Sequence, residues 1–434
     1  MSQATVEFEA VPISVSCESP RICLVSPGHV ASNPRLVKEA DALHHAGYNV
    51  RVVAGDYMAA IRPLDETLLS KVSWQWTQVG LGSKWGYWFR RIRQEAAKKL
   101  ASVGILPLSV ATWAHSPMSL RLARIAAAEP ADLYIGHCLA ALPAVAYAAR
   151  KHGSKFGFDA EDFHVGELSN LSKNRTEVAV RDFLEKTLLP SCVHLTAASP
   201  GIAAAYADRY GIKMQPILNV FPQKDCTKKQ RDITDSEIHI ASQCSSKLSL
   251  YWFSQTIGPG RGLELVIQAM GQMTIATKLC LRGFISEEYR RSLLRLAQSV
   301  GLNDQITFLP SAPPEEMVAL ASVHDVGLSV EPGRDTNNDI CLGNKIFTYL
   351  LAGIPLLMSN TTAQTELAKD LGEAAMLIDL EKADDVAAVL DSLLADSARL
   401  TKMKTIADEL GRSRYNWEIE QHSFLNSVKQ ALAR

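Results

Sequence analysis

The chain lacks the features that define several classes of protein. Its eight cysteines are scattered, with no Cys-x-x-Cys pair and no Cys/His cluster at zinc spacing, which argues against a disulfide framework and a structural metal site. No stretch of about 18 uninterrupted apolar residues occurs, so no membrane-spanning helix is predicted. The 45 basic and 46 acidic side chains balance, which gives no general attraction to nucleic acid. Residues 1–21 are polar and unlike a secretory signal, and we expect a reduced, cytoplasmic protein.

The length and the apolar pattern predict two domains of the α/β class. A chain of 434 residues can form two domains that each bury a core. Short apolar runs typical of parallel strands alternate with segments of helical periodicity. This pattern occupies residues 21–26, 35–46, 48–55, 131–137, 141–151 and 155–162 in the first half, and 248–257, 263–273, 276–283, 287–301, 305–310 and 313–323 in the second. We therefore expect two doubly wound, Rossmann-like domains facing each other across a cleft.

A charged stretch with little apolar periodicity separates the two halves. We place the first domain at residues 18–225, a linker at 226–247 and the second domain at 248–413. A terminal segment follows at 414–434.

The first domain carries an insert at about residues 71–113 that is rich in aromatic and basic side chains. Five of the seven tryptophans lie in it, and residues 84–99 mix aromatics with Arg and Lys. Such a segment can dock on an anionic membrane surface. A helix that packs its aromatics into its own domain is more common, so both interpretations stay open.

The stretch from Glu331 to Asn360 concentrates the features of a ligand site. An apolar run at 327–330 is typical of a buried strand, and a polar loop follows it. Asn344 and Lys345 then begin a segment of helical periodicity. Because the loop and the helix start face the same crevice, free N–H groups there favour a bound anion that the Lys345 ammonium can reach. The alternative is a helix capped by Asn344, with a solvated lysine.

Two arginines in the second half follow strands. Arg261 lies in a glycine loop between a strand and a helix, and Arg282 comes at another strand end. Since ligands bind at the carboxyl ends of strands in such sheets, we expect both guanidiniums to converge on the crevice that Lys345 faces. Solvated surface arginines are the alternative.

A dinucleotide-dependent oxidoreductase is disfavoured by the spacing of the same glycine loop. The glycines are at 258, 260 and 262, which does not match G-x-G-x-x-G, and no acid follows at the distance needed to hold a ribose.

Several segments occur in a set order along the chain: ASPGIAAAYADRYG with ILNV after it, SQTIGPGRGLELVIQAM, QITFLPSAPPEEMVALASVHDVGLS, SVEP and NKIFTYLLAGIPLL. Together they resemble the glycosyltransferase family 4 group over about residues 20 to 420. The resemblance implies a GT-B architecture, with a nucleotide-sugar donor held mainly by the second domain and an acceptor on the first. It also implies transfer with retention of anomeric configuration, no divalent metal or other cofactor, and a last helix, here residues 414–428, that crosses back to the first domain.

The match departs from the family pattern at positions that matter for the chemistry. Members commonly carry two glutamates with seven residues between them, and here those positions hold Ile340 and Thr348. Asp339 is adjacent to the first and is a candidate substitute, while Thr348 offers a hydroxyl in place of the second. Where the family often has a histidine before an aspartate after the fourth strand, this chain has Glu161. His137, after the preceding strand, also faces the cleft in this mapping. The loop of Gly28 does so too, whereas Glu331 starts its loop too early to fill either glutamate role.

These considerations define a set of candidate residues and a function. The predicted catalytic residues are Glu161, His137 and Asp339; the predicted donor-binding residues are Gly28, Arg261, Arg282, Cys341, Leu342, Gly343, Asn344, Lys345 and Thr348; no metal ligand is predicted. We expect a retaining glycosyltransferase of surface polysaccharide or glycoconjugate biosynthesis that takes a nucleotide-sugar donor and a glycan or lipid-linked acceptor. Peripheral contact with the inner face of a membrane is an open alternative. A catalytically inactive relative that serves as a binding or scaffold protein is the competing hypothesis.

Overall fold

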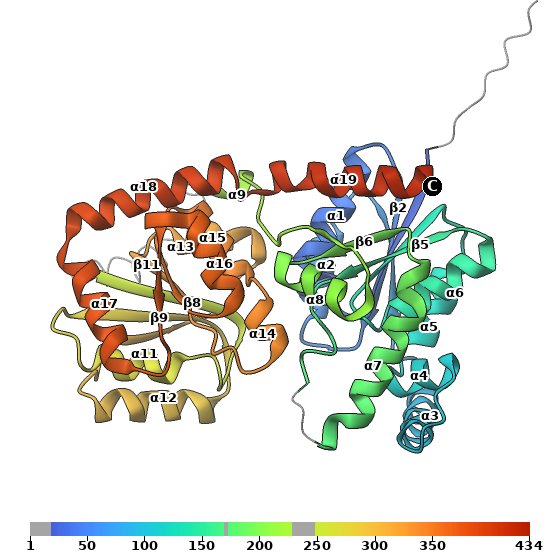
Figure 1. Ribbon diagram of the computed structural model, residues 1–434, viewed down its shortest axis with the longest axis horizontal. Coiled ribbons are helices and arrows are strands. Elements are labelled where there is room, and N and C mark those ends of the chain that lie inside the picture. Colours follow the sequence, from blue (N-terminus) through green and yellow to red (C-terminus); the bar gives the residue numbers. More distant parts are fainter. Residues whose placement is uncertain (1–18, 169–171, 228–247) are drawn as a thin grey trace, which may run out of the picture.

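The computed structural model describes residues 19–168, 172–227 and 248–434, which form two α/β domains side by side (Figure 1). Each domain contains one sheet whose strands all run parallel, and helices cover both faces. The fold is therefore the pair of Rossmann-like domains expected from the alternating pattern. The linker predicted at 226–247 lies almost wholly outside the described residues.

The sheet of the first domain has the order β3-β2-β1-β4-β5-β6-β7. Its strands are β1 (Arg21–Ser26), β2 (Asn49–Asp56), β3 (Gln75–Gly80), β4 (Leu133–His137), β5 (Lys155–Ala160), β6 (His194–Ala197) and β7 (Gln215–Pro216). Its helices are η1 (Val30–Ser32), α1 (Pro34–His45), α2 (Arg62–Leu69), α3 (Lys84–Ser102), α4 (Leu108–His115), α5 (Ser119–Ala126), α6 (Leu142–His152), η2 (Ser172–Asn174), α7 (Arg175–Leu188), η3 (Leu189–Ser191), α8 (Pro200–Tyr210) and α9 (Lys224–Thr227).

The sheet of the second domain has the order β10-β9-β8-β11-β12-β13. Its strands are β8 (Leu248–Ile257), β9 (Thr277–Ile285), β10 (Ile306–Leu309), β11 (Val326–Ser329), β12 (Leu356–Ser359) and β13 (Ala375–Ile378). Its helices are α11 (Leu263–Met270), α12 (Glu287–Ser299), η5 (Pro314–Glu316), α13 (Met317–Ala321), α14 (Thr336–Ile340), α15 (Asn344–Ala352), α16 (Thr362–Leu371), η6 (Gly372–Ala374), α17 (Ala383–Ala395) and α18 (Ser397–Ser413); α19 (Trp417–Ala433) ends the chain.

The strands form where apolar residues run without interruption, because both faces of a parallel sheet are buried. In β1, Ile22 and Leu24 pack into one core cluster while Cys23 and Val25 pack into another on the opposite face. In β8, Leu250 and Trp252 lie in a third cluster.

Each sheet has one point where the strand order reverses. In the first domain the chain moves outward from β1 to β3 and then returns to pair β4 with β1; in the second it moves outward from β8 to β10 and returns at β11. Loops that leave neighbouring strands in opposite directions open a crevice at such a point, and ligands of doubly wound sheets bind there. The carboxyl ends of β1 and β4, and of β8 and β11, are therefore the places to examine for a site.

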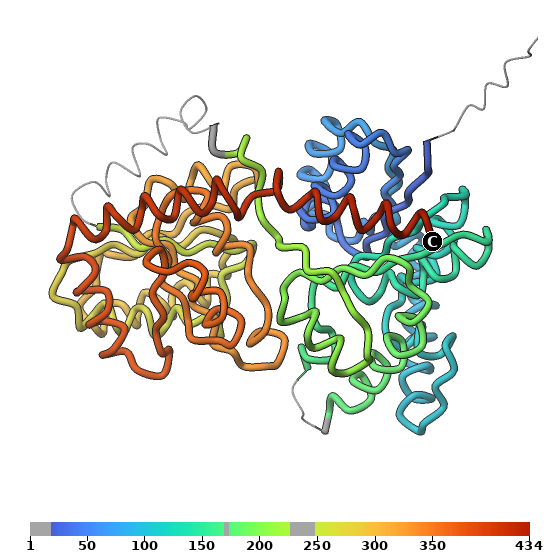
Figure 2. Tube along the Cα trace, turned by 45° about the horizontal axis from the view of Figure 1, so that its top comes forward, coloured from blue at the N-terminus to red at the C-terminus, as the bar shows by residue number. Residues whose placement is uncertain are grey.

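The last two helices run across both domains (Figure 2). Helix α18 packs on the second domain, and α19 lies against the first. The Glu420 carboxylate accepts a hydrogen bond from the Leu218 N–H at 2.6 Å. The Ser427 hydroxyl lies 3.1 Å from Nδ1 of His194.

Helix α14 joins the domains at the crevice. The sequence predicts a polar loop here, but Asp335 accepts a hydrogen bond from the Asn338 N–H at 2.8 Å and so caps a short helix. The buried Asn337 accepts from the Phe163 N–H at 2.7 Å and donates to Asp162 at 2.8 Å. The Ser199 hydroxyl donates to the carbonyl of Ile340 at 2.8 Å, so α14 contacts two loops of the first domain.

The aromatic insert adds an edge strand and two helices to the first domain. Trp74 is buried and its indole N–H donates to Asp41 at 2.8 Å, whereas Trp85 and Trp88 on α3 are 84% and 62% exposed. The interpretation in which the helix packs its aromatics into its own domain is therefore wrong for these two tryptophans. None of the described helices is long and apolar enough to cross a membrane.

Candidate functional site

A lysine and a carboxylate meet at the reversal point of the second sheet. Lys345, in the first turn of α15, is buried to 7% exposure, and its Nζ lies 2.8 Å from Oε1 of Glu331. Its ammonium also lies 5.2 Å from the centre of the Trp252 ring on β8. Two strands and a helix thus fix the position of this cation, and its removal would leave the largely buried Glu331 without its closest partner.

The glycine loop after β8 brings a second cation to the same carboxylate. Nη1 of Arg261 lies 3.6 Å from Oε2 of Glu331, and the arginine side chain is 45% exposed. The loop needs glycine at Gly262, where φ is +74° and a Cβ would lie 3.0 Å from the carbonyl oxygen of Val330. The close approach of the two loops is what sets Arg261 over Glu331.

The start of α15 supplies hydrogen-bond donors. Gly343 is the N-cap residue and has no side chain that could cap the helix. Among the described residues, no acceptor is recorded for the backbone N–H groups of Gly343, Asn344 and Lys345. Unpaired N–H groups and the helix dipole favour an anion at this end, beside the two cations.

The structure does not bring all of the predicted donor residues to this place. Arg282 is buried, and it donates to the Tyr251 hydroxyl at 3.0 Å and to the Pro310 carbonyl at 2.9 Å. Its expected convergence with Arg261 is therefore wrong: β9 turns this side chain inward. Thr348 is fully buried, and its hydroxyl donates to the Asn344 carbonyl at 3.0 Å. It has no surface in this conformation with which to contact a ribose.

Three neighbouring candidates, Asp339, Cys341 and Leu342, lie at the end of α14 and in its connection to α15. Both oxygens of Asp339 accept hydrogen bonds from Thr362, at 2.9 Å from its N–H and 2.6 Å from its hydroxyl. Asp339 thus holds the start of α16, and the expectation that it replaces a glutamate beside the sugar finds no support in this arrangement. Burial raises the pKa of the Cys341 thiol to about 12, and Leu342 is buried. These two residues connect α14 to α15.

Glu161 lies on the carboxyl-end side of the first sheet, where ligands of doubly wound sheets bind. Its carboxylate follows β5, accepts a hydrogen bond from the Asn33 side chain at 2.6 Å and lies 3.2 Å from Nδ1 of His137. The Glu161 side chain is 22% exposed, but His137 is fully buried behind it. Of this predicted pair, only Glu161 reaches the crevice, and His137 can act only through it.

A buried network of charges supports Glu161 from below. Arg35 donates to both oxygens of Asp159, at 2.6 and 2.7 Å. Nε2 of His137 lies 3.4 Å from Glu39. Burial alone would lower the pKa of His137, but the nearby carboxylates of Glu39, Asp159 and Glu161 outweigh it and raise that pKa well above its ordinary value. We therefore assign His137 a positive charge at neutral pH.

Glu39, His137 and Asp159 lie close enough together to hold a metal ion. The Arg35 guanidinium supplies the positive charge that a metal ion would bring to these groups. It donates to both oxygens of Asp159 and lies 3.4 Å from Glu39. Burial raises the pKa of Glu39, while Arg35 holds the pKa of Asp159 well below its usual range despite the burial of that group. The trio is better explained as a charge network than as a metal centre.

The loop after β1 forms the other wall of this crevice. The N–H of Gly28 lies 3.3 Å from the Ser26 hydroxyl, and the next residue, His29, is buried. Nδ1 of His29 lies 2.6 Å from Asp65, and its Nε2 accepts from the N–H groups of Tyr57 and Met58. This histidine fixes the loop.

Sequence reasoning missed two parts of the site. Glu331 starts its loop too early to match either family glutamate, yet it pairs with both cations. Arg35 and Glu39 were not singled out, although a charged pair four residues apart on a helix face with Leu36, Ala40 and Leu43 is a usable signal for a buried ion pair.

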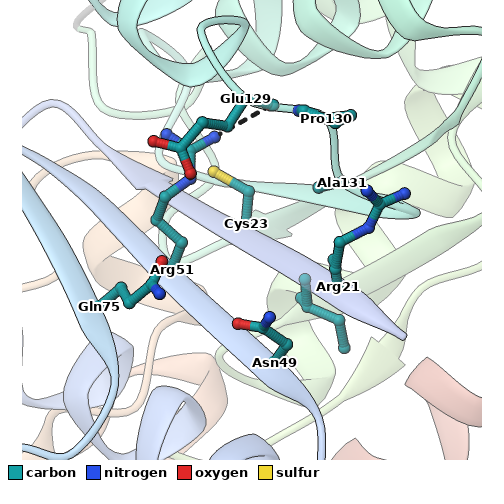
Figure 3. Close-up of a pocket in the computed structure, with 9 residues that line it drawn as sticks. Arg21, Cys23, Asn49, Arg51, Gln75, Glu129, Pro130 and Ala131 are labelled. Atoms are coloured by element: carbon teal, nitrogen blue, oxygen red, sulfur yellow. Dashed lines mark hydrogen bonds and ion pairs between the residues drawn. The ribbon is translucent and has the colours of Figure 1, made fainter. Parts of the chain in front are cut away.

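The small hollow in Figure 3 lies elsewhere. Its lining includes Arg21, Cys23, Asn49, Arg51 and Gln75, at the amino ends of β1, β2 and β3. Its volume is about 50 Å³, too small for a sugar nucleotide. This edge of the sheet faces away from the crevice of Glu161, which follows the carboxyl end of β5.

Comparison with solved structures agrees with the fold over almost the whole chain. Anabaena Alr3699/HepE, solved in complex with UDP and glucose, superposes with a TM-score of 0.70 at 14% identity, covering 94% of this chain and 99% of that one. Sucrose-phosphate synthase from Thermosynechococcus elongatus superposes with a TM-score of 0.71 at 15% identity, covering 95% and 99%. Two Rossmann-like domains with this likeness define a protein of the GT-B fold class.

Sequence comparison is informative for the second half. Residues 236–410 match the family model described as glycosyl transferases group 1, so the second domain is a group 1 glycosyl transferase domain. D-inositol 3-phosphate glycosyltransferases from Rhodococcus opacus (strain B4) and Nocardia farcinica (strain IFM 10152) are 26% and 27% identical over 140 and 143 residues. These matches span 32% of this chain and 30% of each relative.

Proposed function

We propose that the chain is a retaining glycosyltransferase that moves a sugar from a nucleotide-sugar donor to an acceptor hydroxyl. The observation that carries the proposal is the meeting of Lys345, Arg261 and the uncapped start of α15 at the reversal point of the second sheet. The group 1 match covers these residues, and HepE was solved with UDP and with UDP-glucose. A diphosphate placed there would meet two cations and a row of N–H groups.

Charge on the leaving diphosphate is the main demand of this chemistry. As the bond to the sugar breaks, negative charge grows on the phosphate oxygens, and donors already aimed at that place stabilise the transition state more than the ground state. Lys345 is held by Glu331 and Trp252, so little reorganisation is needed. Arg261 is more exposed and can turn from Glu331 toward the second phosphate group.

Glu161 is the group we assign to the acceptor. It is the exposed end of the carboxylate and histidine network in the first domain, at the carboxyl end of β5. A carboxylate there can orient the acceptor hydroxyl or take its proton. His137 and Asn33 fix its direction, so we assign them as positioning residues.

We propose that donor binding needs no divalent cation, because Lys345 and Arg261 supply the positive charge that a metal would otherwise bring. Transfer measured with excess EDTA should equal transfer measured with added magnesium. A requirement for the metal would contradict this assignment.

The first experiment is a transfer assay with a panel of nucleotide sugars, in the wild-type protein and in Lys345→Ala and Arg261→Ala. Both variants should lose transfer, the first by about 100-fold or more, since one charge-assisted donor in a reacting site contributes about that much. Glu409→Ala on the exposed side of α18 is the control. Full activity in both variants would refute the site.

A second hypothesis is a catalytically inactive binding or scaffold protein. It is favoured by two observations: Glu331 already pairs with both cations, and Ile340 and Thr348 stand where the family has glutamates. Calorimetric titration with nucleoside diphosphates separates the hypotheses, because a scaffold of this kind should bind none of them.

We further propose that the acceptor is a glycan or a lipid-linked glycan, and that the protein works at the cytoplasmic side in surface polysaccharide or glycoconjugate assembly. The proposal is supported by the partly exposed Glu161 carboxylate, which a glycan hydroxyl can reach from solvent. Mass spectrometry of products formed with glycan and glycolipid acceptors tests this.

A further inference from the structure

Helix α3 exposes an apolar surface that its own domain does not cover. Trp85, Trp88, Phe89 and Ile92 follow one another at helical spacing and are 84%, 62%, 78% and 65% exposed. The opposite side of the helix, with Gln94 and Ala97, is buried against the domain. This is the reverse of an ordinary surface helix, whose apolar side faces the core.

Basic side chains flank this apolar surface. Helix α3 contains Lys84, Arg90, Arg91, Arg93, Lys98 and Lys99 against a single acid, Glu95. Glu95 lies 3.9 Å from Arg91 and 3.7 Å from Lys98, so it offsets only part of their charge. The chain as a whole has a formal charge of −1, so this is a local excess.

Four arginines, two on α3 and two on α5, lack a carboxylate partner in the described part of the chain. In the described part of the chain, no ion pair involves Arg90 or Arg93 of α3, or Arg121 or Arg124 of α5. Burial and the charge of Arg121 lower the pKa of Arg90; burial and the charge of Arg124 lower that of Arg93. The Nε atoms of Arg90 and Arg93 are buried without a hydrogen-bond partner. Arg90 donates to the Leu81 carbonyl and Arg93 lies 5.2 Å from the centre of the Trp113 ring, so neither partner carries a negative charge. Guanidiniums without a carboxylate partner favour a bound phosphate.

We propose that α3 docks the first domain on an anionic phospholipid bilayer. Its side chains from Trp85 to Ile92 enter the interface, and the flanking Lys and Arg bind lipid phosphates. Tryptophan is enriched at the boundary between lipid headgroups and acyl chains, and a helix of about 28 Å can lie in the plane of that boundary. Helix α3 lies at the end of the domain away from α19 (Figure 1), so the C-terminal helix does not obstruct it. A second copy of this chain docked face to face would bring like charges together, which disfavours a dimer here.

The connection to the crevice follows from the topology. Residues 81–83 link the carboxyl end of β3 to Trp85, so the aromatic end of α3 begins at the same edge of the sheet as Glu161. A bilayer held at this edge lies beside the crevice. The inference does not rest on the proposed donor site, which is in the other domain.

The experiment is sedimentation of the full chain with vesicles of phosphatidylcholine alone or mixed with phosphatidylglycerol. We expect binding only to the anionic vesicles, weakening as salt is raised. Trp85→Ser/Trp88→Ser/Phe89→Ser should weaken binding by more than about tenfold, and Arg91→Gln/Lys98→Gln/Lys99→Gln by about fivefold or more per charge removed. Trp76→Ser on the edge strand and Arg290→Gln/Arg291→Gln on α12 are matched controls, exposed but outside the surface.

Three results would overturn the inference: no binding to anionic vesicles at low salt, equal binding to both vesicle types, or unchanged binding by both α3 variants. A shift of the triple aromatic variant from dimer to monomer, without any effect on vesicles, would assign the surface to a second copy of the chain. Nucleotide titration of the same variants should match the wild type, so failure of the membrane inference and failure of the donor site are distinguishable.

Discussion

The two crevices of this molecule are built differently although the sheets behind them have the same plan. In the first domain a deep network of ionisable groups, with Arg35, Glu39, His137 and Asp159 all buried, ends in one partly exposed carboxylate, Glu161. In the second domain the charged groups are few, and Lys345 and Arg261 share a single partner, Glu331.

The difference teaches what each crevice is fitted to do. A carboxylate held by a buried, charged scaffold is aimed with little freedom, which suits a group that must orient a hydroxyl. A cation pair over one carboxylate, next to free helix N–H groups, can exchange that carboxylate for a diphosphate. The first crevice is thus organised around an acid and the second around two cations beside free helix N–H groups.

The largest expected effect comes from breaking the network of the first domain. Arg35→Met removes the guanidinium that pairs with the buried Asp159 and Glu39, and we expect a loss of about 3–5 kcal/mol in the free energy of unfolding. Urea denaturation measures it. Arg209→Met, which breaks an exposed pair with Asp182, is the control and should cost no more than about 1 kcal/mol. Equal losses would mean that burial of the network has no energetic consequence.

The next prediction separates acceptor chemistry from donor binding. Glu161→Gln keeps the shape and removes the charge, so the transfer rate should fall by about 100-fold or more while nucleotide affinity stays unchanged. Steady-state kinetics and titration check both halves. Glu167→Gln, whose partner is Arg181, is the matched control. A weaker donor affinity in Glu161→Gln would contradict its assignment to the acceptor.

A smaller effect is expected on nucleotide affinity. Lys345→Ala should weaken binding of a nucleoside diphosphate by about 10- to 100-fold, the value of one charge-assisted hydrogen bond. Arg261→Ala should weaken it less, since that side chain is half exposed and its contact with Glu331 is longer. Lys404→Ala removes a pair with Asp325, which precedes β11 and so lies at the opposite edge of the sheet from the start of α15, and it should have no effect. The reverse order of Lys345 and Arg261 would contradict the assigned geometry.

The smallest effect is a contrast in pH dependence. Burial and the charge of Arg282 lower the pKa of His324 to about 4, so the unfolded state takes up a proton first and stability falls as the pH drops from 6.5 toward 4. Burial lowers the pKa of His164, but Glu185 outweighs this effect and raises it. The stabilisation that protonated His164 gives the folded state is therefore complete below pH 6.5 and is lost as the pH rises through the folded pKa.

Unfolding measured at about pH 5 and pH 8 tests this contrast. His324→Gln should reduce the loss of stability in acid by on the order of 1 kcal/mol, and His164→Gln should reduce the loss on the alkaline side. If both substitutions changed the pH dependence of stability in the same direction, the expected contrast between His324 and His164 would be contradicted.

The strands, the helices and Lys345 could be predicted from the sequence because local patterns carry that information. The face of the sheet to which a side chain at a strand end points depends on register. Arg282 points to the same buried face of β9 as Cys280, which the local sequence does not indicate. Thr348 could not be oriented either: α15 is buried on all sides from Lys345 to Ala352, so helical periodicity gives no outer face.

The contacts of Glu331 and Glu161 are long-range, and no spacing encodes them. Glu161 bonds to Asn33, 128 positions away in the chain, and Glu331 meets Arg261 across two loops whose approach depends on Gly262. The exposure of Trp85 and Trp88 depends on where the domain ends, which aromatic spacing alone does not indicate.

Backbone hydrogen exchange with and without a saturating nucleoside diphosphate such as UDP tests the central claim most directly. If the second domain holds the diphosphate, exchange should slow at Gly343, Asn344 and Lys345 and in the loop of Gly260 to Gly262, and should stay unchanged in β4 and β5 of the first domain. Unaltered exchange at the start of α15, with or without protection elsewhere, would contradict the account.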